Sequence, residues 1–322
     1  GLLTGDISIN REAHVLVMTT EIFRNMLYGE FEDLEDPLVN LESVILDECH
    51  YMNDPQRGTV WEETIIHCPS NTQIVALSAT VSNSKQLKNW INKVHGPTSL
   101  INSINRPVPL EFIFCSAKGF HPLLNKKGNG IHPNCKVWRA PKGQLKKSRS
   151  GRITQPKTPP ISFVISNLAE RKMLPAIYFI FSRRGCDKAV ANIKDLTLVN
   201  YKEASLINEK LSKYIKNNQE GIKDKINFEA LKRGVASHHA GQLPAWKEFV
   251  EELFQMGLIK VVFATETLAA GINMPARTTI ISSLSKRTEN GHRLLFSSEF
   301  LQMSGRAGRR GNCLLYTSDA AD

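Results

Sequence analysis

Two adjacent carboxylates at the end of an apolar run are the residues of this chain best suited to chemistry. Val44-Ile45-Leu46 leads directly into Asp47 and Glu48, and Cys49 and His50 follow. A short apolar run rich in β-branched residues predicts a buried strand. Both acids are then expected at the C-terminal end of that strand, where open parallel α/β sheets bind their ligands.

Successive strand residues point to opposite faces, so two adjacent acids are expected to have different roles. In a site that hydrolyses a phosphate, one acid can hold Mg²⁺, directly or through water. The other can orient or deprotonate the attacking water. The alternative is an acidic loop at the end of a core strand, and the four residues from Asp47 to His50 do not by themselves separate the two interpretations.

Length and composition predict a globular protein with two domains. The chain has 322 residues, of which 41% are hydrophobic and 22% are charged, and this is enough for two domains with ordinary cores. No apolar run approaches the length of a membrane span, about 20 residues. The chain begins with Gly1 instead of Met, so we expect the natural N-terminus, with any targeting segment, to be missing.

The cysteines and histidines do not predict a metal site. The six cysteines form no Cys-x-x-Cys pair, and several lie in apolar runs. This pattern predicts buried thiols in a reducing intracellular compartment and argues against zinc or a disulfide framework. His238 and His239 are adjacent but lack partner ligands at suitable spacing, so a structural role is the preferred interpretation.

The positive charge of the chain comes from one segment. The net charge is +10, yet the segment 118–160 contains eleven Lys or Arg and no Asp or Glu, which leaves 30 basic and 31 acidic residues elsewhere. A basic block predicts contact with nucleic acid or another polyanion. The alternative is a solvated, disordered loop.

Strands and helices are predicted to alternate, which implies an α/β fold with parallel sheets covered by helices on both faces. Thr20 is the expected N-cap of the first helix, with Glu21 in its first turn. The first half is predicted to contain strands at 14–18, 44–46, 73–77 and 107–115 and helices at 20–28, 58–67 and 84–94. The second half is predicted to contain strands at 175–181, 234–237, 258–264 and 278–282 and helices from 183, at 203–217, at 244–256 and after 297.

Five segments, taken in order, resemble motifs II to VI of the superfamily-two DExH helicases. They are Asp47–His50, Ser78–Thr80, Phe181–Arg183, Ala264–Asn273 and Gln302–Arg309. The resemblance is closest to the superkiller-like RNA helicases, and within them to the branch of plant chloroplasts and cyanobacteria. Residues 57–63 and 237–241 support that placement, and the resemblance extends over residues 1 to 312.

The resemblance implies two tandem RecA-like domains with parallel sheets, the first of them truncated at its N-terminus. The implied divisions are 1–117 for domain 1, 118–170 for a basic insertion or linker, 171–312 for domain 2 and 313–322 for a tail. The tail resembles the translation of a sequencing-library adapter and is expected to be non-native.

The resemblance also implies ATP and Mg²⁺ as cofactors. Asp47 would hold Mg²⁺ and Glu48 would activate water, while Gln302, Arg306 and Arg309 would act on the phosphates from the other domain, so that hydrolysis requires domain closure. Coupling between nucleotide state and closure is assigned to His50, Ser78 and Thr80. Further nucleotide contacts are assigned to Gly271 and Asn273.

The implied partner is single-stranded or structured RNA, with no membrane association. Hydroxyls, backbone N–H groups and helix N-termini suit phosphates and sugars, so binding is expected to be independent of sequence. Each threonine taken singly could instead be an ordinary helix cap. The residues assigned to RNA are Thr4, Gly5, Thr19, Thr20, Glu21, Ser182, Arg183 and Thr265.

One element of the family is absent. No G-x-x-x-x-G-K-[ST] motif occurs, nor even the dipeptide Gly-Lys, so the phosphate-binding loop is expected to lie upstream of Gly1. The chain is therefore predicted to be a fragment of an ATP-dependent RNA helicase that is inactive alone. The alternatives are an RNA-binding scaffold deficient in ATPase activity and a DNA helicase of the same superfamily. A chloroplast location is suggested by the resemblance only.

Overall fold

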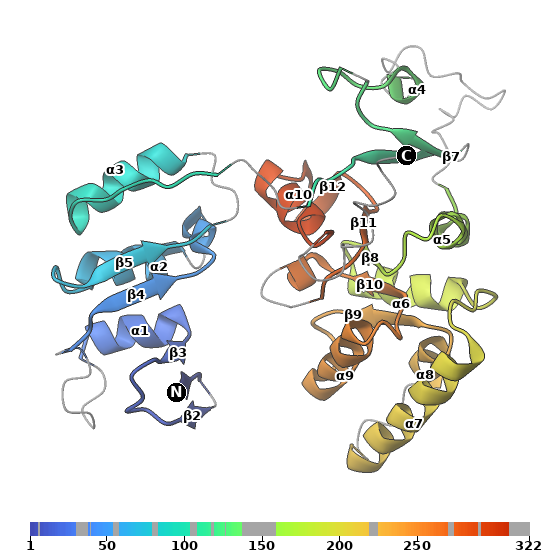
Figure 1. The fold of residues 1–322 in the computed structure, drawn as a ribbon, viewed down its shortest axis with the longest axis horizontal. Coiled ribbons are helices and arrows are strands. Elements are labelled where there is room, and N and C mark those ends of the chain that lie inside the picture. Colours follow the sequence, from blue (N-terminus) through green and yellow to red (C-terminus); the bar gives the residue numbers. More distant parts are fainter. Residues whose placement is uncertain are drawn as a thin grey trace. The chain divides into compact units, whose positions relative to one another are not determined.

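The structure is a computed structural model that divides the chain into two compact units, Gly1–Asn105 and Arg106–Asp322 (Figure 1). It describes the whole chain except residues 6, 30–37, 39, 54–57, 79–82, 104–107, 117–118, 126, 137–158, 219–224, 270–273, 289–290 and 309–322. Within the described residues, no helix is both long and apolar enough to cross a membrane.

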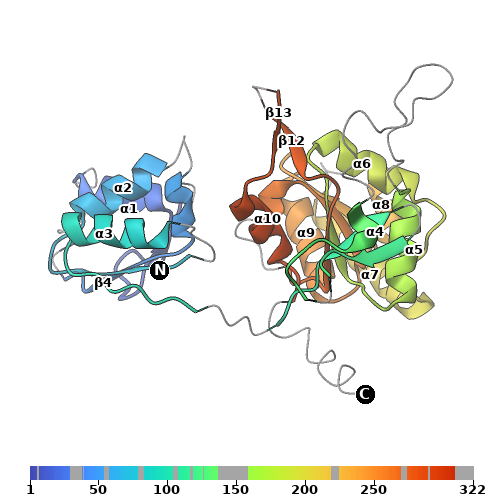
Figure 2. The same cartoon turned by 90° about the horizontal axis from the view of Figure 1, so that it is seen from above.

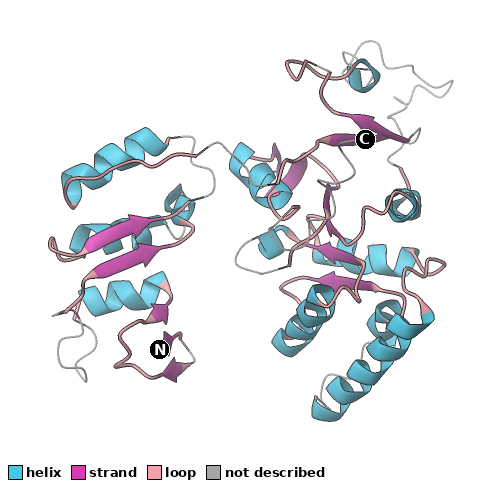
Figure 3. Ribbon diagram, viewed as in Figure 1, coloured by secondary structure: helices cyan, strands magenta, loops and turns pink. Residues whose placement is uncertain are grey.

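The first unit contains two small sheets. The strands β4 (Ser43–Leu46) and β5 (Gln73–Ala76) pair in parallel, with Leu46 opposite Ala76 (Figure 3). A second sheet has the order β2-β1-β3 and is made of β1 (Leu2–Leu3), β2 (Ser8–Ile9) and β3 (Val17–Met18).

The core of the first unit forms where three helices meet one face of β4. The helices are α1 (Thr20–Leu27), α2 (Gly58–His67) and α3 (Ser84–Val94). Burial alternates along β4, because Val44 and Leu46 face the core whereas Ile45 is 67% exposed. This alternation is the period of two expected for a strand covered on one face. Thr19, and not the predicted Thr20, is the N-cap of α1, and it makes no side-chain capping hydrogen bond.

The second unit is built on a four-stranded parallel sheet with the order β11-β8-β10-β9 (Figure 1). Figure 2 shows the helices of this unit from above. The strands are β8 (Ala176–Phe179), β9 (Val235–His238), β10 (Val261–Ala264) and β11 (Thr278–Ile281). Every residue of β8, β9 and β10 is buried. Parallel strands covered on both faces require such continuous burial, which explains why β8 and β10 are unbroken apolar runs. Strand β9 is the exception, because it buries Ser237 and His238.

Helices pack on both faces of this sheet. Tyr178 and Phe263 pack in the core with α5 (Ile161–Glu170) and α6 (Arg183–Asn192), beside α8 (Lys225–Leu231). Phe179 and Val262 pack in the opposite core, which includes residues of α7 (Tyr201–Asn217), α9 (Pro244–Gln255) and α10 (Ser297–Ser304). The parallel sheets and their helical layers confirm the predicted α/β class.

Short elements complete the second unit. Two antiparallel pairs are formed by β6 (Ile113–Ser116) with β7 (Gly119–Pro122), and by β12 (Ser285–Thr288) with β13 (Gly291–Leu294). The remaining helical segments are α4 (Pro133–Lys136) and the 3-10 helix η4 (Glu266–Ala269), while the first unit has the 3-10 helix η1 (Cys49–Asn53).

The boundary between the units differs from the predicted division at residue 117. The first unit ends at Asn105, and the strand containing Cys115 belongs to the second unit, where Cys115 and Phe120 pack against the cluster around Tyr178. Helix α5, which was expected to lie in the linker 118–170, contributes Ile165 to the same core with no exposed surface. An apolar run shows that a strand or helix forms, but not which sheet it joins.

Four of the cysteines are buried, as predicted: Cys49, Cys68, Cys135 and Cys186. Cys115 is half-buried, and all five described cysteines are free thiols. Cys313 lies outside the described residues.

Candidate nucleotide and RNA sites

The predicted acidic pair lies in a turn at the C-terminal end of β4, as the sequence suggested. The backbone of Glu48 has a φ of 57°, a left-handed conformation that costs a non-glycine residue about 1–2 kcal/mol. The Glu48 N–H donates to Asp47 Oδ1 at 2.8 Å. Asp47 is exposed and Glu48 is partly exposed, so both carboxylates are accessible for ligand binding.

Hydrogen bonds join this turn to the segment after β5. The Cys49 N–H donates to the Leu77 carbonyl at 2.9 Å, and the Leu77 N–H donates to the Leu46 carbonyl at 2.8 Å. Burial raises the pKa of the Cys49 thiol, and a hydrogen bond with the Ser78 side chain opposes that effect. The structure therefore brings together two segments separated by about thirty residues, as expected for motifs II and III. Thr80 lies outside the described residues.

His50 lies beside Glu48. Its Nδ1 is 3.3 Å from Glu48 Oε2, and its ring stacks on Tyr51 with a centroid separation of 4.7 Å. The imidazole therefore contacts both the ring of Tyr51 and the Glu48 carboxylate.

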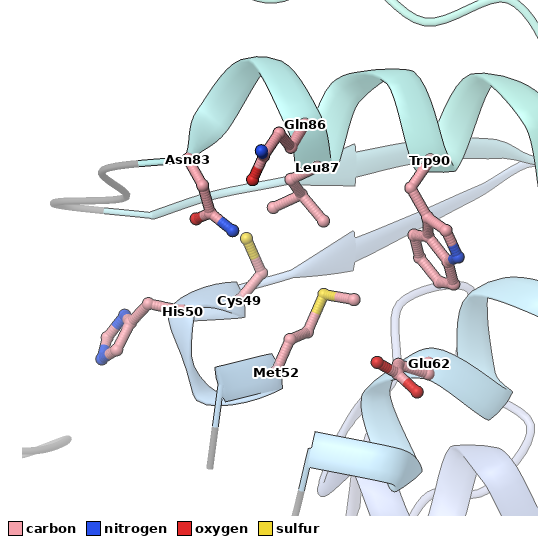
Figure 4. A pocket seen from close by; sticks show the side chains of 8 residues that line it. All are labelled: Cys49, His50, Met52, Glu62, Asn83, Gln86, Leu87 and Trp90. Atoms are coloured by element: carbon pink, nitrogen blue, oxygen red, sulfur yellow. The ribbon is translucent and has the colours of Figure 1, made fainter.

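A small pocket of about 200 Å³ adjoins η1 (Figure 4). Cys49 and Asn83 lie toward one end, and Glu62 and Trp90 lie toward the other. Neither Asp47 nor Glu48 lines this pocket. His50, which lies 3.3 Å from Glu48, does line it, so the pocket adjoins the acidic turn without including its carboxylates.

Asp47 and Glu48 could supply some, but not all, of the ligands that Mg²⁺ requires. Mg²⁺ keeps several waters and is held by one or two carboxylates together with substrate phosphates, so it needs no dense cluster of protein ligands. The described residues contain no group of three or more His, Cys, Asp or Glu able to hold a metal ion. The exposed Asp47 suits such a water-rich site.

Motif VI begins on α10 and continues into the turn 306–308, which is hydrogen-bonded to Ala276. Gln302 is partly exposed on α10, whereas the Arg306 side chain is only 2% exposed. Ala307 forms a parallel bridge with Ala276, and the Gly308 N–H donates to the Ala276 carbonyl at 3.0 Å. This conformation does not present Arg306 at the surface, in contrast to its predicted role as an arginine finger. Arg309 lies outside the described residues.

Motif V lies at the C-terminal end of β10. Thr265 is partly exposed, and its hydroxyl is 2.9 Å from that of Thr267. Its position at the edge where parallel strands end is compatible with ligand contact. Gly271 and Asn273 lie outside the described residues.

A polar cluster that the sequence did not reveal surrounds His239. Its Nε2 is 2.9 Å from Asp187 Oδ1, and Ser237 Oγ donates to the same carboxylate oxygen at 3.2 Å. The Gln242 amide donates to Ser237 Oγ at 2.7 Å.

The neighbouring His238 also has a carboxylate partner. Its Nε2 is 2.7 Å from Glu251 Oε1, and burial lowers the pKa of His238. Both histidines thus have carboxylate partners, as a structural role requires. Asp187 was missed because nothing in the sequence links it to the histidines, whereas Gln242 directly follows the segment 237–241 and could have been included.

The predicted RNA contacts of the second unit lie beside this cluster. Ser182 caps α6, because its Oγ accepts the Gly185 N–H at 3.0 Å. A Cβ on Gly241 would lie 3.3 Å from Arg183 Cδ, so the turn after β9 approaches the exposed Arg183 closely. The N-terminus of α6 and this turn therefore form one surface.

In the first unit the predicted RNA contacts lie in two turns. Thr4 Oγ1 accepts the Ile7 N–H at 3.0 Å, and Gly5 is exposed in the same turn. Thr19 is exposed, whereas Thr20 and Glu21 are partly exposed at the start of α1. A helix start with accessible N–H groups is suited to a phosphate.

Two family models match the chain. The DEAD/DEAH box helicase model matches residues 4–88, and the helicase conserved C-terminal domain model matches residues 188–311. Each match falls within one of the two units described above. The chain belongs to the DExH-box helicases of superfamily two, with their tandem RecA-like domains.

Three relatives are similar to this chain over nearly its whole length. The chain is 42% identical to the chloroplastic DExH-box ATP-dependent RNA helicase DExH15 of Arabidopsis thaliana, over 97% of this chain and 30% of that protein. It is 40% identical to the probable helicase HelY of Mycobacterium tuberculosis, over 97% of this chain and 36% of that protein. It is also 40% identical to the human exosome RNA helicase MTR4, over 97% of this chain and 31% of that protein. The chain thus spans about a third of the length of these relatives.

Proposed function

We propose that this chain is part of an ATP-dependent RNA helicase that couples ATP hydrolysis to the unwinding or remodelling of RNA. The observation that carries the proposal is the turn Asp47–His50, in which two accessible carboxylates and a histidine converge at the end of a parallel strand. The similarity to proteins named as RNA helicases supports RNA as the nucleic acid.

In the proposed reaction, bound MgATP supplies the phosphoanhydride bond that water cleaves. Asp47 would hold the cation, which would neutralise charge on the phosphates, and Glu48 would orient the attacking water and accept its proton. His50 keeps the Glu48 carboxylate in place, since its Nδ1 lies 3.3 Å from Oε2. Ser78 lies in the segment after β5, and its side chain forms a hydrogen bond with the Cys49 thiol, which connects that segment to this turn.

Gln302, Arg309, Gly271 and Asn273 are proposed nucleotide contacts on the strength of the family pattern. Arg306 has the same assignment, but its side chain is 2% exposed. A direct contact from Arg306 would therefore need a rearrangement of the turn 306–308. Thr4, Gly5, Thr19, Thr20, Glu21, Ser182, Arg183 and Thr265 are the proposed RNA contacts.

The test uses the longer protein to which this chain corresponds. We expect ATP hydrolysis that single-stranded RNA stimulates, and displacement of a labelled strand from an RNA duplex that requires ATP. Residues 1–322 alone should hydrolyse ATP poorly, because the chain has no Gly-Lys dipeptide from which a phosphate-binding loop could be built. RNA-stimulated hydrolysis by residues 1–322 at the rate of the longer protein would refute that expectation.

The same measurements distinguish two other functions from the proposed one. An RNA-binding scaffold would bind RNA but show no stimulated hydrolysis even in the longer protein. A DNA helicase would prefer single-stranded DNA in a competition at stated salt concentration. Intact Glu48 and Gln302 favour an active enzyme over the scaffold.

A chloroplast location is proposed from the Arabidopsis relative, which is named as chloroplastic. The upstream coding sequence tests it, since a transit peptide would be rich in Ser and Arg and poor in acids. The nucleotide sequence at the 3′ end likewise tests whether 313–322 is adapter-derived.

A further inference from the structure

A group of four charged side chains joins four elements of the second unit. Lys286 Nζ on β12 lies 2.5 Å from Glu266 Oε2 on η4 and 2.7 Å from Glu299 Oε1 on α10. Arg293 on β13 binds both oxygens of Glu299, at 2.7 and 2.8 Å. The Lys286 side chain is 13% exposed and that of Glu299 is 23% exposed, so solvent screens this group only in part.

The charge pattern of the strand pair is unfavourable without α10. Lys286 and Arg293 are direct partners in the antiparallel register, and so they face the same side of the ribbon. Like charges at directly opposed positions destabilise a strand pair. Glu299 lies between the two cations and binds both. The docking of β12 and β13 on α10 is therefore specified by charge.

Glu299 also fixes the start of α10. Its Oε2 accepts the Phe296 N–H at 2.8 Å, which caps the first turn of the helix. Gln302 follows Glu299 by three residues, which places the two side chains on neighbouring positions of one helix face. A change in the position of Glu299 is therefore passed to Gln302 and to the turn after it.

The other partner of Lys286 belongs to motif V. Glu266 directly follows Thr265, a proposed RNA contact, at the end of β10. A single ammonium group is thus bound by one carboxylate next to a proposed RNA contact and by another next to a proposed nucleotide contact.

We propose that Lys286 and Glu299 are positioning residues that couple RNA binding at motif V to the placement of motif VI, and hence to ATP hydrolysis. This inference rests on the proposed function. RNA bound at Thr265 sets the position of Glu266, and Lys286 transmits that position to Glu299 and α10. Loss of the ammonium should uncouple RNA binding from hydrolysis without preventing either one.

The experiment compares Lys286→Met with Lys210→Met in the longer protein. Lys210 pairs with Glu252 at 2.6 Å on α7 and α9 of the same unit, which makes it a matched ion-pair control. The measurements are the ratio of kcat with and without single-stranded RNA, the KM for ATP, the Kd for labelled RNA and the melting temperature.

We expect Lys286→Met to reduce the stimulation by RNA at least tenfold, with KM and Kd within twofold of the wild type. Lys210→Met should leave the ratio unchanged, and Lys286→Arg should restore it, because a guanidinium can bind both carboxylates. Glu299→Gln gives a second variant, since glutamine preserves the capping hydrogen bond but removes the charge.

If RNA stimulates hydrolysis in Lys286→Met and in Glu299→Gln as strongly as in the wild type, the inference is overturned and the proposed function is not affected. A lower melting temperature without loss of stimulation also overturns it, because the group would then only stabilise the fold. If the wild-type protein shows no RNA-stimulated hydrolysis, the proposed function fails and the inference falls with it.

Discussion

His50 Nδ1 lies 3.3 Å from Glu48 Oε2, within the turn that ends β4. The contact joins a residue with a left-handed backbone to the residue two positions later, so the turn itself brings the two side chains together. The same turn holds both carboxylates, since Asp47 Oδ1 accepts the Glu48 N–H at 2.8 Å while the Glu48 carboxylate lies against the imidazole.

Replacement of Glu48 by glutamine should abolish most ATP hydrolysis in the longer protein. A positioned general base contributes about 10²–10⁴-fold to the rate, and glutamine keeps the size of the side chain while it removes the base. We expect kcat to fall by at least about 100-fold, with RNA affinity within twofold of the wild type. Steady-state hydrolysis and fluorescence anisotropy measure the two quantities.

Glu42→Gln is the matched control for this prediction. Glu42 is an exposed glutamate just before β4, and its backbone carbonyl, which accepts the Gln73 N–H at 2.9 Å, is unaffected by the change. A loss of activity in Glu42→Gln equal to that in Glu48→Gln would assign the effect to general charge and not to catalysis.

Local patterns predicted the acidic turn, but long-range packing decided the orientation of the basic motif. The run before Asp47 specifies a strand because its residues are apolar and β-branched, and the acids then follow from their position. Arg306 was expected to act on phosphates, but its side chain is 2% exposed. The bridge between Ala307 and Ala276 turns it inward, and no local pattern encodes that bridge.

The strand pair β12 and β13 was not predicted for a similar reason. Ser285–Thr288 and Gly291–Leu294 contain few apolar residues and do not alternate. Their pairing is stabilised by Glu299, which lies on a helix further along the chain. Likewise, α7 begins at Tyr201, before the predicted residue 203, because Asn200 and Glu203 form a capping box.

The stability of the second unit should decrease at acid pH through Glu299. Burial alone would raise the pKa of Glu299, but hydrogen bonds from Arg293, Lys286 and the Phe296 N–H outweigh it and lower the pKa from 4.5 to about 2. The folded state therefore binds this proton less readily than the unfolded state does. The stabilisation is present above pH 4.5 and is lost as the pH falls toward 2.

Glu299→Gln should remove this contribution, which is at most about 3 kcal/mol from a shift of this size. Urea unfolding at pH 7 and pH 3 would measure it. The difference in free energy of unfolding between wild type and variant should be larger at pH 7 than at pH 3. An equal difference at both pH values would contradict the ionic origin of the effect.

Ile65 and Ile66 on α2 offer a direct test of the core of the first unit. Ile65 has no exposed surface and belongs to the cluster with Trp61 and Ile91, whereas Ile66 is 48% exposed. Ile65→Ala should reduce the free energy of unfolding by about 2–5 kcal/mol, because it removes buried methyl groups and leaves a cavity. Ile66→Ala, with the same chemical change, should cost less than about 1 kcal/mol. Urea unfolding measures both values, and equal losses for the two variants would contradict the selective burial of Ile65.

Gly308 in motif VI should be intolerant of a side chain for two separable reasons. Its φ is +70°, and a Cβ would lie 2.9 Å from Val108 Cγ1. Gly128 has almost the same φ, +68°, but a Cβ there would meet no atom within 4 Å. Gly128→Ala thus measures the cost of the backbone conformation alone, about 1–2 kcal/mol. Gly308→Ala should cost an additional 1–3 kcal/mol or so from overpacking against Val108.

The double variant Gly308→Ala with Val108→Ala isolates the steric part of this cost. Removal of the two valine methyl groups opens the space that the new Cβ needs, so the alanine at 308 should be less costly in the Val108→Ala background than in the wild type. Urea unfolding of the four proteins in this cycle gives the coupling energy between the two positions. A coupling energy near zero would mean that Val108 does not pack on Gly308 in solution.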